Sequence, residues 1–283
     1  MTTENNTQIT FIGAGNMARS LIAGLIGDNA AVQITVADPS EEQLDVVRGR
    51  WPQCLTTTDN VQAVNQADLV VLAVKPQLMQ TVCESLADAI QEAKPLIMSV
   101  AAGVSESSLS RWLGGLLPVV RCMPNTPALV QSGMSGLYAN SRVSDEQRSL
   151  AESVMRAVGM VLWFDDEEKL HAVTAVSGSG PAYFFLVMEA MQRTAENFGL
   201  TQEDARLLVM QTAFGAAKLA LESTDSAAEL RQKVTSKGGT TEAAIAQLQA
   251  GGLEEMFDLA LKAAAQRSVM LSGGKPAIGK SEG

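Results

Sequence analysis

The segment Gly13-Ala14-Gly15-Asn16-Met17-Ala18 constrains the fold of this chain more than any other part of the sequence. It matches G-x-G-x-x-[GA] and lies between an apolar run at residues 9–12 and an amphipathic stretch that continues to about residue 27. In such a turn one glycine allows the bend, another lets the backbone approach a pyrophosphate, and a small third residue lets the helix pack closely. Free N–H groups at the helix start favour phosphate. We therefore expect a dinucleotide to bind here; the alternative is a structural glycine turn.

Short apolar runs alternate with helical periodicity throughout the first half of the chain. A continuous apolar run such as residues 69–74 is typical of a strand that is buried on both faces of a parallel sheet. The alternation predicts βαβ units and an α/β fold with a Rossmann-type doubly wound parallel sheet. Strands are expected at residues 9–12, 33–37, 54–56, 69–74, 96–100, 119–122 and 161–164, and helices at 13–27, 39–48 (opened by Pro39) and 60–65.

The second half has a different character, which begins after the acidic run at residues 165–168. Strand-like runs stop there, and helices are expected at residues 181–199, 202–222, 227–234, 241–250 and 253–271. The helix after Pro181 is apolar nearly all round at its beginning, so it must be buried on every side. A small helical domain has little interior to offer it, and burial against a second subunit is the simplest solution. We predict two domains, a dinucleotide-binding domain at 1–164 and an all-helical domain at 165–283.

Residues at the ends of the predicted strands complete the expected cofactor site, because ligands of open parallel sheets bind beyond the carboxyl ends of the strands. Asp38 follows the second strand; an acid there favours NAD, since it accepts hydrogen bonds from a ribose and repels a 2′-phosphate. Alternatively, Asp38 caps the next helix and leaves Ser40 to hold a phosphate. Lys75 could protonate a substrate, but a contact with a cofactor phosphate or a solvent-facing position is more typical, and we count it among the candidate cofactor-binding residues. The other candidate cofactor-binding residues are Asn60, Ala73, Val74, Pro76, Ala101, Gly103, Pro124 and Asn125.

Composition excludes several classes of protein. Hydrophobic residues make up 46% and charged residues 18%, and the net charge is −10. This composition excludes a mainly disordered chain, and the negative charge argues against nucleic-acid binding. Three scattered cysteines and one histidine predict no metal site and fit a reducing cytoplasm. A polar N-terminus and short apolar runs predict a cytoplasmic protein without a membrane span. Cys122 is expected to be a small buried residue, and His171 a structural or surface one.

Three further motifs give the sequence a family resemblance. Residues 176–183 read Val-Ser-Gly-Ser-Gly-Pro-Ala-Tyr, residues 123–125 read Met-Pro-Asn, and residues 234–241 read Val-Thr-Ser-Lys-Gly-Gly-Thr-Thr. Together they closely resemble pyrroline-5-carboxylate reductase, from the glycine loop to about residue 271. The resemblance implies reduction of L-1-pyrroline-5-carboxylate to L-proline, the last step of proline biosynthesis. It further implies NADP as cofactor, with NAD as the alternative that Asp38 favours, and homodimers formed through the helical domain, often assembled into decamers.

The last of these motifs predicts the substrate site. Hydroxyl groups and free N–H groups at a helix N-terminus suit a carboxylate, and two glycines allow close approach. The expected substrate-binding residues are Ser236, Gly238, Gly239, Thr240 and Thr241; by resemblance, the catalytic residue is Thr241, whose hydroxyl hydrogen-bonds the ring nitrogen. Lys237 departs from the family, which usually has proline there, and Asp38 is less typical of NADPH-preferring members.

Two other functions remain open at the level of sequence. One is another two-domain NAD(P)-dependent dehydrogenase of the β-hydroxyacid or prephenate type, in which Lys169 or His171 would have to serve in catalysis. The other is a non-catalytic dinucleotide sensor.

Overall fold

The computed structural model describes residues 6–28 and 31–274, which form two compact units. The first unit extends to Ser179 and takes up the chain again from Ala264, and the second unit is Gly180–Ala263. Compactness thus divides the chain at residue 180 and returns the end of the last helix to the first unit. The expected division into an α/β domain at 1–164 and an all-helical domain at 165–283 stays a prediction, and its residues 1–5, 29–30 and 275–283 lie outside the described part.

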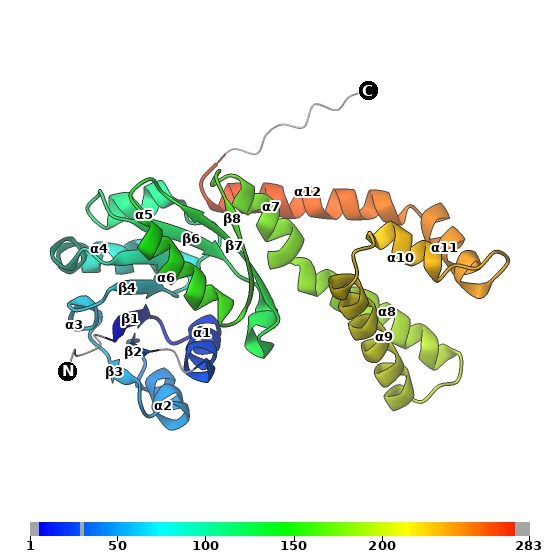
Figure 1. Ribbon diagram of the computed structural model, residues 1–283, viewed down its shortest axis with the longest axis horizontal. Coiled ribbons are helices and arrows are strands. Elements are labelled where there is room, and N and C mark those ends of the chain that lie inside the picture. Colours follow the sequence, from blue (N-terminus) through cyan, green and yellow to red (C-terminus); the bar gives the residue numbers. More distant parts are fainter. Residues whose placement is uncertain (1–5, 29–30, 275–283) are drawn as a thin grey trace. The chain divides into compact units, whose positions relative to one another are not determined.

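An eight-stranded sheet forms the centre of the first unit (Figure 1). Its order is β3-β2-β1-β4-β5-β6-β7-β8, and neighbouring strands are parallel except for the antiparallel pair β6–β7. The doubly wound, mainly parallel sheet confirms the predicted fold class. The strands are β1 (Thr7–Ile12), β2 (Val32–Ala37), β3 (Leu55–Thr57), β4 (Leu69–Leu72), β5 (Leu96–Ser99), β6 (Val119–Met123), β7 (Gly133–Ala139) and β8 (Gly159–Phe164).

Helices cover both faces of this sheet. One apolar core includes side chains of α1 (Asn16–Gly27), α2 (Glu41–Arg50) and α6 (Asp145–Arg156), and a second includes side chains of α3 (Asn60–Val64), α4 (Pro76–Ala93) and α5 (Glu106–Trp112). The expected start of the second helix at Pro39 is wrong. Ser40 is the N-cap of α2, and its side chain accepts a hydrogen bond from the backbone N–H of Gln43, as the capping preference of serine predicts.

Strand β7 was not expected, because its glycines weaken the usual strand signal. A Cβ atom at Gly136 would lie 2.7 Å from Val173 Cγ1, and one at Gly133 would lie 2.9 Å from Val158 O. These glycines therefore allow neighbouring segments to pack directly on the strand. Val173 belongs to the short helix α7 (Lys169–Val173), which continues into a π-helical turn at Thr174–Gly178.

The second unit is helical, as predicted. It contains α8 (Gly180–Asn197), α9 (Gln202–Glu222), α10 (Ala227–Lys233), α11 (Thr240–Ala250) and the first part of α12 (Leu253–Leu271). Although α8 packs against α9, large apolar side chains of both helices are exposed in the single chain, among them Phe184, Phe185 and Phe214 at 68%, 62% and 62%. A single copy of the chain therefore does not supply the burial that the sequence of α8 requires.

One helical stretch of the described chain is long and apolar enough to cross a membrane. It spans Lys169–Asn197, with a mean hydropathy of 1.2 over its most apolar part. The π-helical turn lies within it. Length and composition are weak criteria here, because a helix that is buried in a subunit interface meets them equally well.

Candidate active site

The carboxyl ends of the central parallel strands meet at one edge of the sheet. Ile12, the last residue of β1, pairs with Ala37 at the end of β2 and with Leu72 at the end of β4. Leu72 in turn pairs with Ser99 at the end of β5. This register brings together the segments that follow these strands, which carry most of the cofactor-binding residues predicted from the sequence.

The glycine loop lies directly against the end of β4. Gly13 has a φ of 101°, and a Cβ atom there would lie 2.8 Å from the carbonyl oxygen of Ala73 and 3.2 Å from Val74 Cγ1. A residue with a side chain would therefore be strained and would collide with the backbone. At the third small position Ala18 is fully buried, which allows α1 to pack closely on the sheet.

Gly15 has a different role from Gly13. It is the N-cap of α1, whose first turn begins with Asn16 and Met17. This helix start has no side-chain cap and no acidic residue in its first turn. A Cβ atom at Gly15 would meet no described atom within 4 Å. Packing within the described chain thus does not require a glycine here, whereas a phosphate that approaches the N–H groups of α1 would.

A second uncapped helix start lies beside the first. Helix α4 begins at Pro76, and its N-cap, Lys75, makes no capping hydrogen bond through its side chain to any described group. Lys75 is exposed. The two helix starts and the exposed ammonium group are the local donors that an anionic cofactor needs in a protein of net charge −10.

Asp38 holds the glycine loop to the turn before α2. Its Oδ2 accepts a hydrogen bond from the Ala14 N–H at 2.8 Å, and its Oδ1 accepts one from the Ser40 N–H at 2.9 Å. The carboxylate therefore organises both turns, and its remaining lone pairs can still accept a ribose hydroxyl. Arg19, which sequence reasoning missed, supports the same loop: its Nε donates to Ala14 O at 2.9 Å. The motif gives no signal for this residue.

Asn60 carries an unpaired acceptor. Its Oδ1 is the one buried side-chain nitrogen or oxygen atom without a hydrogen-bond partner among the described residues. Asp59 caps α3 through the N–H groups of Val61 and Gln62, so the amide of Asn60 is not needed as the cap. A buried unpaired acceptor is costly; a ribose or adenine donor would satisfy it, which fits the predicted cofactor role.

The segments after β5 and β6 form the remaining part of the predicted cofactor site. Gly103 has a φ of 71°, and a Cβ atom there would lie 2.8 Å from the Cβ of Leu271 on α12. Ala101 and Pro124 are buried. Both polar atoms of the Asn125 amide are already used: Nδ2 donates to Ser177 O at 3.1 Å and Oδ1 accepts from the Met134 N–H at 2.9 Å. Asn125 thus ties this segment to the π-helical turn and to β7.

The predicted substrate motif lies in the second unit, at the start of α11. Gly238 has a φ of 73°, and Gly239 is the N-cap of α11. Gly239 has no side chain with which to cap, and the helix that follows begins with Thr240 and Thr241. One donor is already engaged, because the Gly238 N–H donates to Glu242 Oε2 at 2.6 Å. The sequence analysis did not predict a role for Glu242, whose carboxylate accepts from one of the N–H groups that were expected to bind the substrate carboxylate.

Neither His171 nor Cys122 presents a free catalytic group. His171 is buried, its Nδ1 lies 2.8 Å from Ser268 Oγ, and its Nε2 lies 3.6 Å from Glu168 Oε2. It therefore links α7 to α12. Cys122 is buried, and burial raises the pKa of its thiol above the ordinary value, so the side chain stays protonated. Within residues 6–28 and 31–274, no cluster of three or more His, Cys, Asp or Glu residues could hold a metal ion.

Two family models match the chain, one in each half. Residues 167–271 match the family model of pyrroline-5-carboxylate reductase dimerisation, and residues 8–103 match that of coenzyme F420-dependent NADP oxidoreductases. Pyrroline-5-carboxylate reductases of Pseudomonas aeruginosa and Haemophilus influenzae are 53% and 43% identical, covering 94% and 92% of this chain and 97% and 96% of their own.

Solved structures give the same result. A pyrroline-5-carboxylate reductase from Coxiella burnetii has a TM-score of 0.90 and 49% identity, over 95% of this chain and 99% of that one. The Plasmodium falciparum enzyme with NADP bound is 24% identical, covers 94% of this chain and 98% of its own, and shares the fold with a TM-score of 0.83.

The different surroundings of Gly13 and Gly15 lead to a paired prediction. Gly13→Ala should lower the free energy of unfolding by about 1–3 kcal/mol, because it forces a side chain into a strained conformation against Ala73. Gly15→Ala should change stability by less than about 0.5 kcal/mol but weaken NADPH binding, because its methyl group occupies space in front of α1. Urea unfolding without cofactor and fluorescence titration with NADPH measure the two effects. Wild-type NADPH affinity in Gly15→Ala would contradict the assigned role of this loop.

Proposed function

The chain belongs to the pyrroline-5-carboxylate reductase family, and from this premise we propose that it reduces L-1-pyrroline-5-carboxylate to L-proline with NADPH or NADH. This is the last step of proline biosynthesis. The observation that carries the proposal is the 53% identity over 94% of the chain. The open glycine loop before α1 and the Gly-Gly-Thr start of α11 supply helix N-termini for the two anionic ligands.

The proposed chemistry needs little from the protein beyond binding and orientation. The reaction adds a hydride to the imine carbon and a proton to the ring nitrogen, and a reduced nicotinamide, when bound, supplies the hydride. The glycine loop and the start of α4 hold the phosphates of the cofactor. Ser236, Gly239 and Thr240 hold the substrate carboxylate, and the hydroxyl of Thr241 hydrogen-bonds the ring nitrogen. Catalysis then rests on positioning and on exclusion of water.

The choice between NADPH and NADH depends on Asp38 in this proposal. The two backbone hydrogen bonds keep its negative charge at the end of β2, and Glu41 and Glu42 add negative charge in the first turn of α2. Both features disfavour a 2′-phosphate. Ser40, at the N-cap of the same helix, favours it. We therefore infer that the chain binds NADP, as its family does, and that Asp38 allows NAD to compete.

The chain forms homo-oligomers, as the match to the family's dimerisation model over residues 167–271 indicates. The proposed basic assembly is a homodimer that buries the apolar side chains of α8 and α9, which a single chain leaves exposed. Further association into decamers follows from the family resemblance. We further propose that the protein is cytoplasmic and binds neither a membrane nor nucleic acid. The net charge of −10 agrees with the absence of nucleic-acid binding.

Substrate-dependent oxidation of NADPH or NADH, followed at 340 nm, tests the function. We expect turnover with pyrroline-5-carboxylate and a fall of about 10- to 100-fold in kcat/KM for Thr241→Ala, because a hydrogen bond to a charged or developing charged group is lost. Thr241→Ser, which keeps the hydroxyl, is the matched control and should retain most activity. Folded protein that binds NADPH but turns over with neither cofactor would indicate a dinucleotide sensor instead. Equal kcat/KM in wild type and Thr241→Ala would remove the role of Thr241.

Asp38→Asn tests the cofactor choice. The change removes a negative charge and keeps an oxygen that can accept one of the two backbone hydrogen bonds. Two unit charges about 4 Å apart repel by about 1 kcal/mol in water and more in a less polar site. The NADPH/NADH ratio of kcat/KM should therefore rise at least tenfold, as steady-state kinetics with each cofactor will measure. Asp88→Asn on the exposed face of α4 controls for net charge, and the same ratio in Asp38→Asn and wild type would contradict the proposal.

A further inference from the structure

Glu167 belongs to the acidic run that marks the end of the α/β half of the sequence, yet its side chain turns back to the sheet. Its Oε1 lies 2.8 Å from Nη1 of Arg121, a nearly buried residue of β6 whose side chain is only 7% exposed. Val119, two residues earlier on the same strand, belongs to the core beneath α4 and α5, so Arg121 points toward that face. A buried guanidinium needs such a partner, since an unpaired buried charge is strongly unfavourable.

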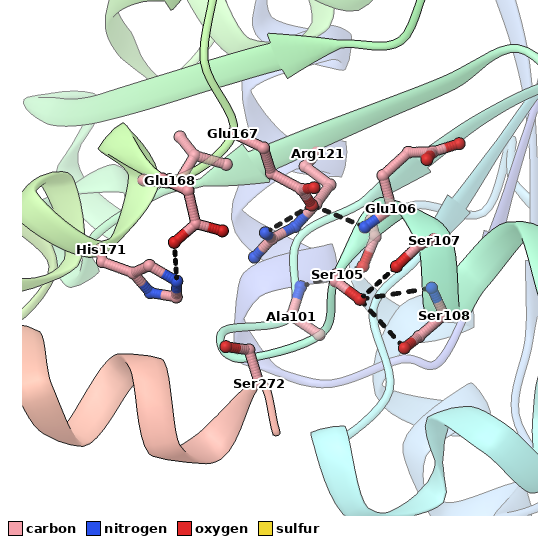
Figure 2. A network of polar contacts seen from close by, with 12 residues as sticks. Ala101, Ser105, Glu106, Ser107, Ser108, Arg121, Glu167, Glu168, His171 and Ser272 are labelled. Carbon is pink, nitrogen blue, oxygen red and sulfur yellow. Dashed lines mark hydrogen bonds and ion pairs between the residues drawn. The ribbon is translucent and has the colours of Figure 1, made fainter. Parts of the chain in front are cut away.

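The same oxygen also binds the start of α5. Glu167 Oε1 accepts a hydrogen bond from the Glu106 N–H at 2.6 Å, and Glu106 is the first residue of that helix. Figure 2 shows the carboxylate between Arg121 and Glu106. Ser105, the N-cap, accepts a hydrogen bond from the Ser108 N–H at 3.2 Å. Two N–H groups in the first turn of α5 thus have acceptors. The Ser108 N–H donates to the N-cap residue, and the Glu106 N–H donates to a residue 61 positions later in the sequence.

Glu106 extends this network to Asn140, which follows β7. Its Oε1 accepts hydrogen bonds from Ser110 Oγ at 2.6 Å and from Asn140 Nδ2 at 2.7 Å. Asn140 follows β7 and also accepts from the Val119 N–H at 3.2 Å. The start of α5 is therefore fixed to β6, to the end of β7 and to the turn after β8. Because α5 has only seven residues, these contacts, more than the helix itself, determine where it begins.

The position of α5 sets the position of the loop that precedes it. This loop connects β5 to α5 and contains Ala101 and Gly103, two of the proposed cofactor contacts. At its first end the Ala101 N–H donates to Ser99 Oγ at 3.4 Å, and in its middle Gly103 lies against Leu271. At its second end the loop reaches Ser105 and Glu106, where Glu167 binds. Loss of the Glu167 contact would loosen this second end, which Asn140 would still hold through the Glu106 side chain, and would leave the contacts of Ala101 and Gly103 in place.

We propose that Glu167 is a positioning residue for the cofactor: through the N–H of Glu106 and the guanidinium of Arg121 it holds the β5–α5 loop in the conformation that binds the dinucleotide. The proposal rests on the proposed function, because it takes Ala101 and Gly103 as cofactor contacts. Glu167 itself touches neither ligand in this account. Loss of the Glu167 carboxylate should therefore weaken cofactor binding more than substrate binding.

The test is the variant Glu167→Gln, which keeps the size of the side chain and removes its charge. We expect the KM for NADPH and the dissociation constant for NADP⁺ to rise about tenfold, while the KM for pyrroline-5-carboxylate changes less than about twofold. Glu168→Gln changes the neighbouring exposed carboxylate and should leave all three constants unchanged. Steady-state kinetics and isothermal titration calorimetry with NADP⁺ measure them, at a temperature well below the melting point of each variant.

A purely structural ion pair predicts a different result. In that case Glu167→Gln lowers the melting temperature and leaves both cofactor constants at the wild-type values, and this outcome overturns the proposal. Arg121→Lys, which keeps the charge but loses the planar guanidinium, is the second variant and replaces Glu167→Gln if that variant does not fold. It should raise both cofactor constants and leave the KM for pyrroline-5-carboxylate nearly unchanged. Wild-type protein that binds no dinucleotide would refute the proposed function, whereas tight binding by both wild type and Glu167→Gln would refute this inference alone.

Discussion

The close approach of Gly13 to the end of β4 is the contact on which the candidate cofactor site depends. It is possible because Gly13 has no side chain and a φ of 101°, and it directs the chain into α1 with the N–H groups of the first turn uncapped. Asp38 then fixes the loop by binding the Ala14 N–H and the Ser40 N–H with one carboxylate. A single carboxylate thus joins the glycine loop to the turn before α2, where we propose that the ribose of a dinucleotide binds.

The negative charge of the protein gives these backbone donors their importance. A chain of net charge −10 that acts on an anionic substrate with an anionic cofactor needs local donors for both, such as helix N-termini and single cationic side chains. The starts of α1, α4 and α11 provide them. The carboxylates near these donors, Asp38 in the first unit and Glu242 in the second, hold backbone N–H groups in place, and they also restrict which anions can bind there.

Local patterns in the sequence predicted most of the fold, and contacts between distant residues explain what they missed. Helices α9 and α12 begin and end at the residues that the sequence predicted. Strand β7 was not predicted because glycine has a low strand propensity, and its glycines are explained only by the close packing of neighbouring segments. The bond between Arg121 and Glu167 joins residues 46 positions apart, which no local pattern can indicate. The cofactor role of Asn125 stays a prediction, and in the structure both polar atoms of its amide are bonded to backbone groups.

Hydrogen–deuterium exchange with and without NADP⁺ is the most direct test of the central claim, that the dinucleotide binds at the carboxyl ends of β1, β4 and β5. The account predicts slower exchange in peptides that cover residues 13–19, 73–79 and 100–106 when NADP⁺ is present. Peptides from the amino ends of the same strands should exchange at the same rate in both conditions. Protection confined to any other part of the protein, with these three segments unchanged, would contradict the account.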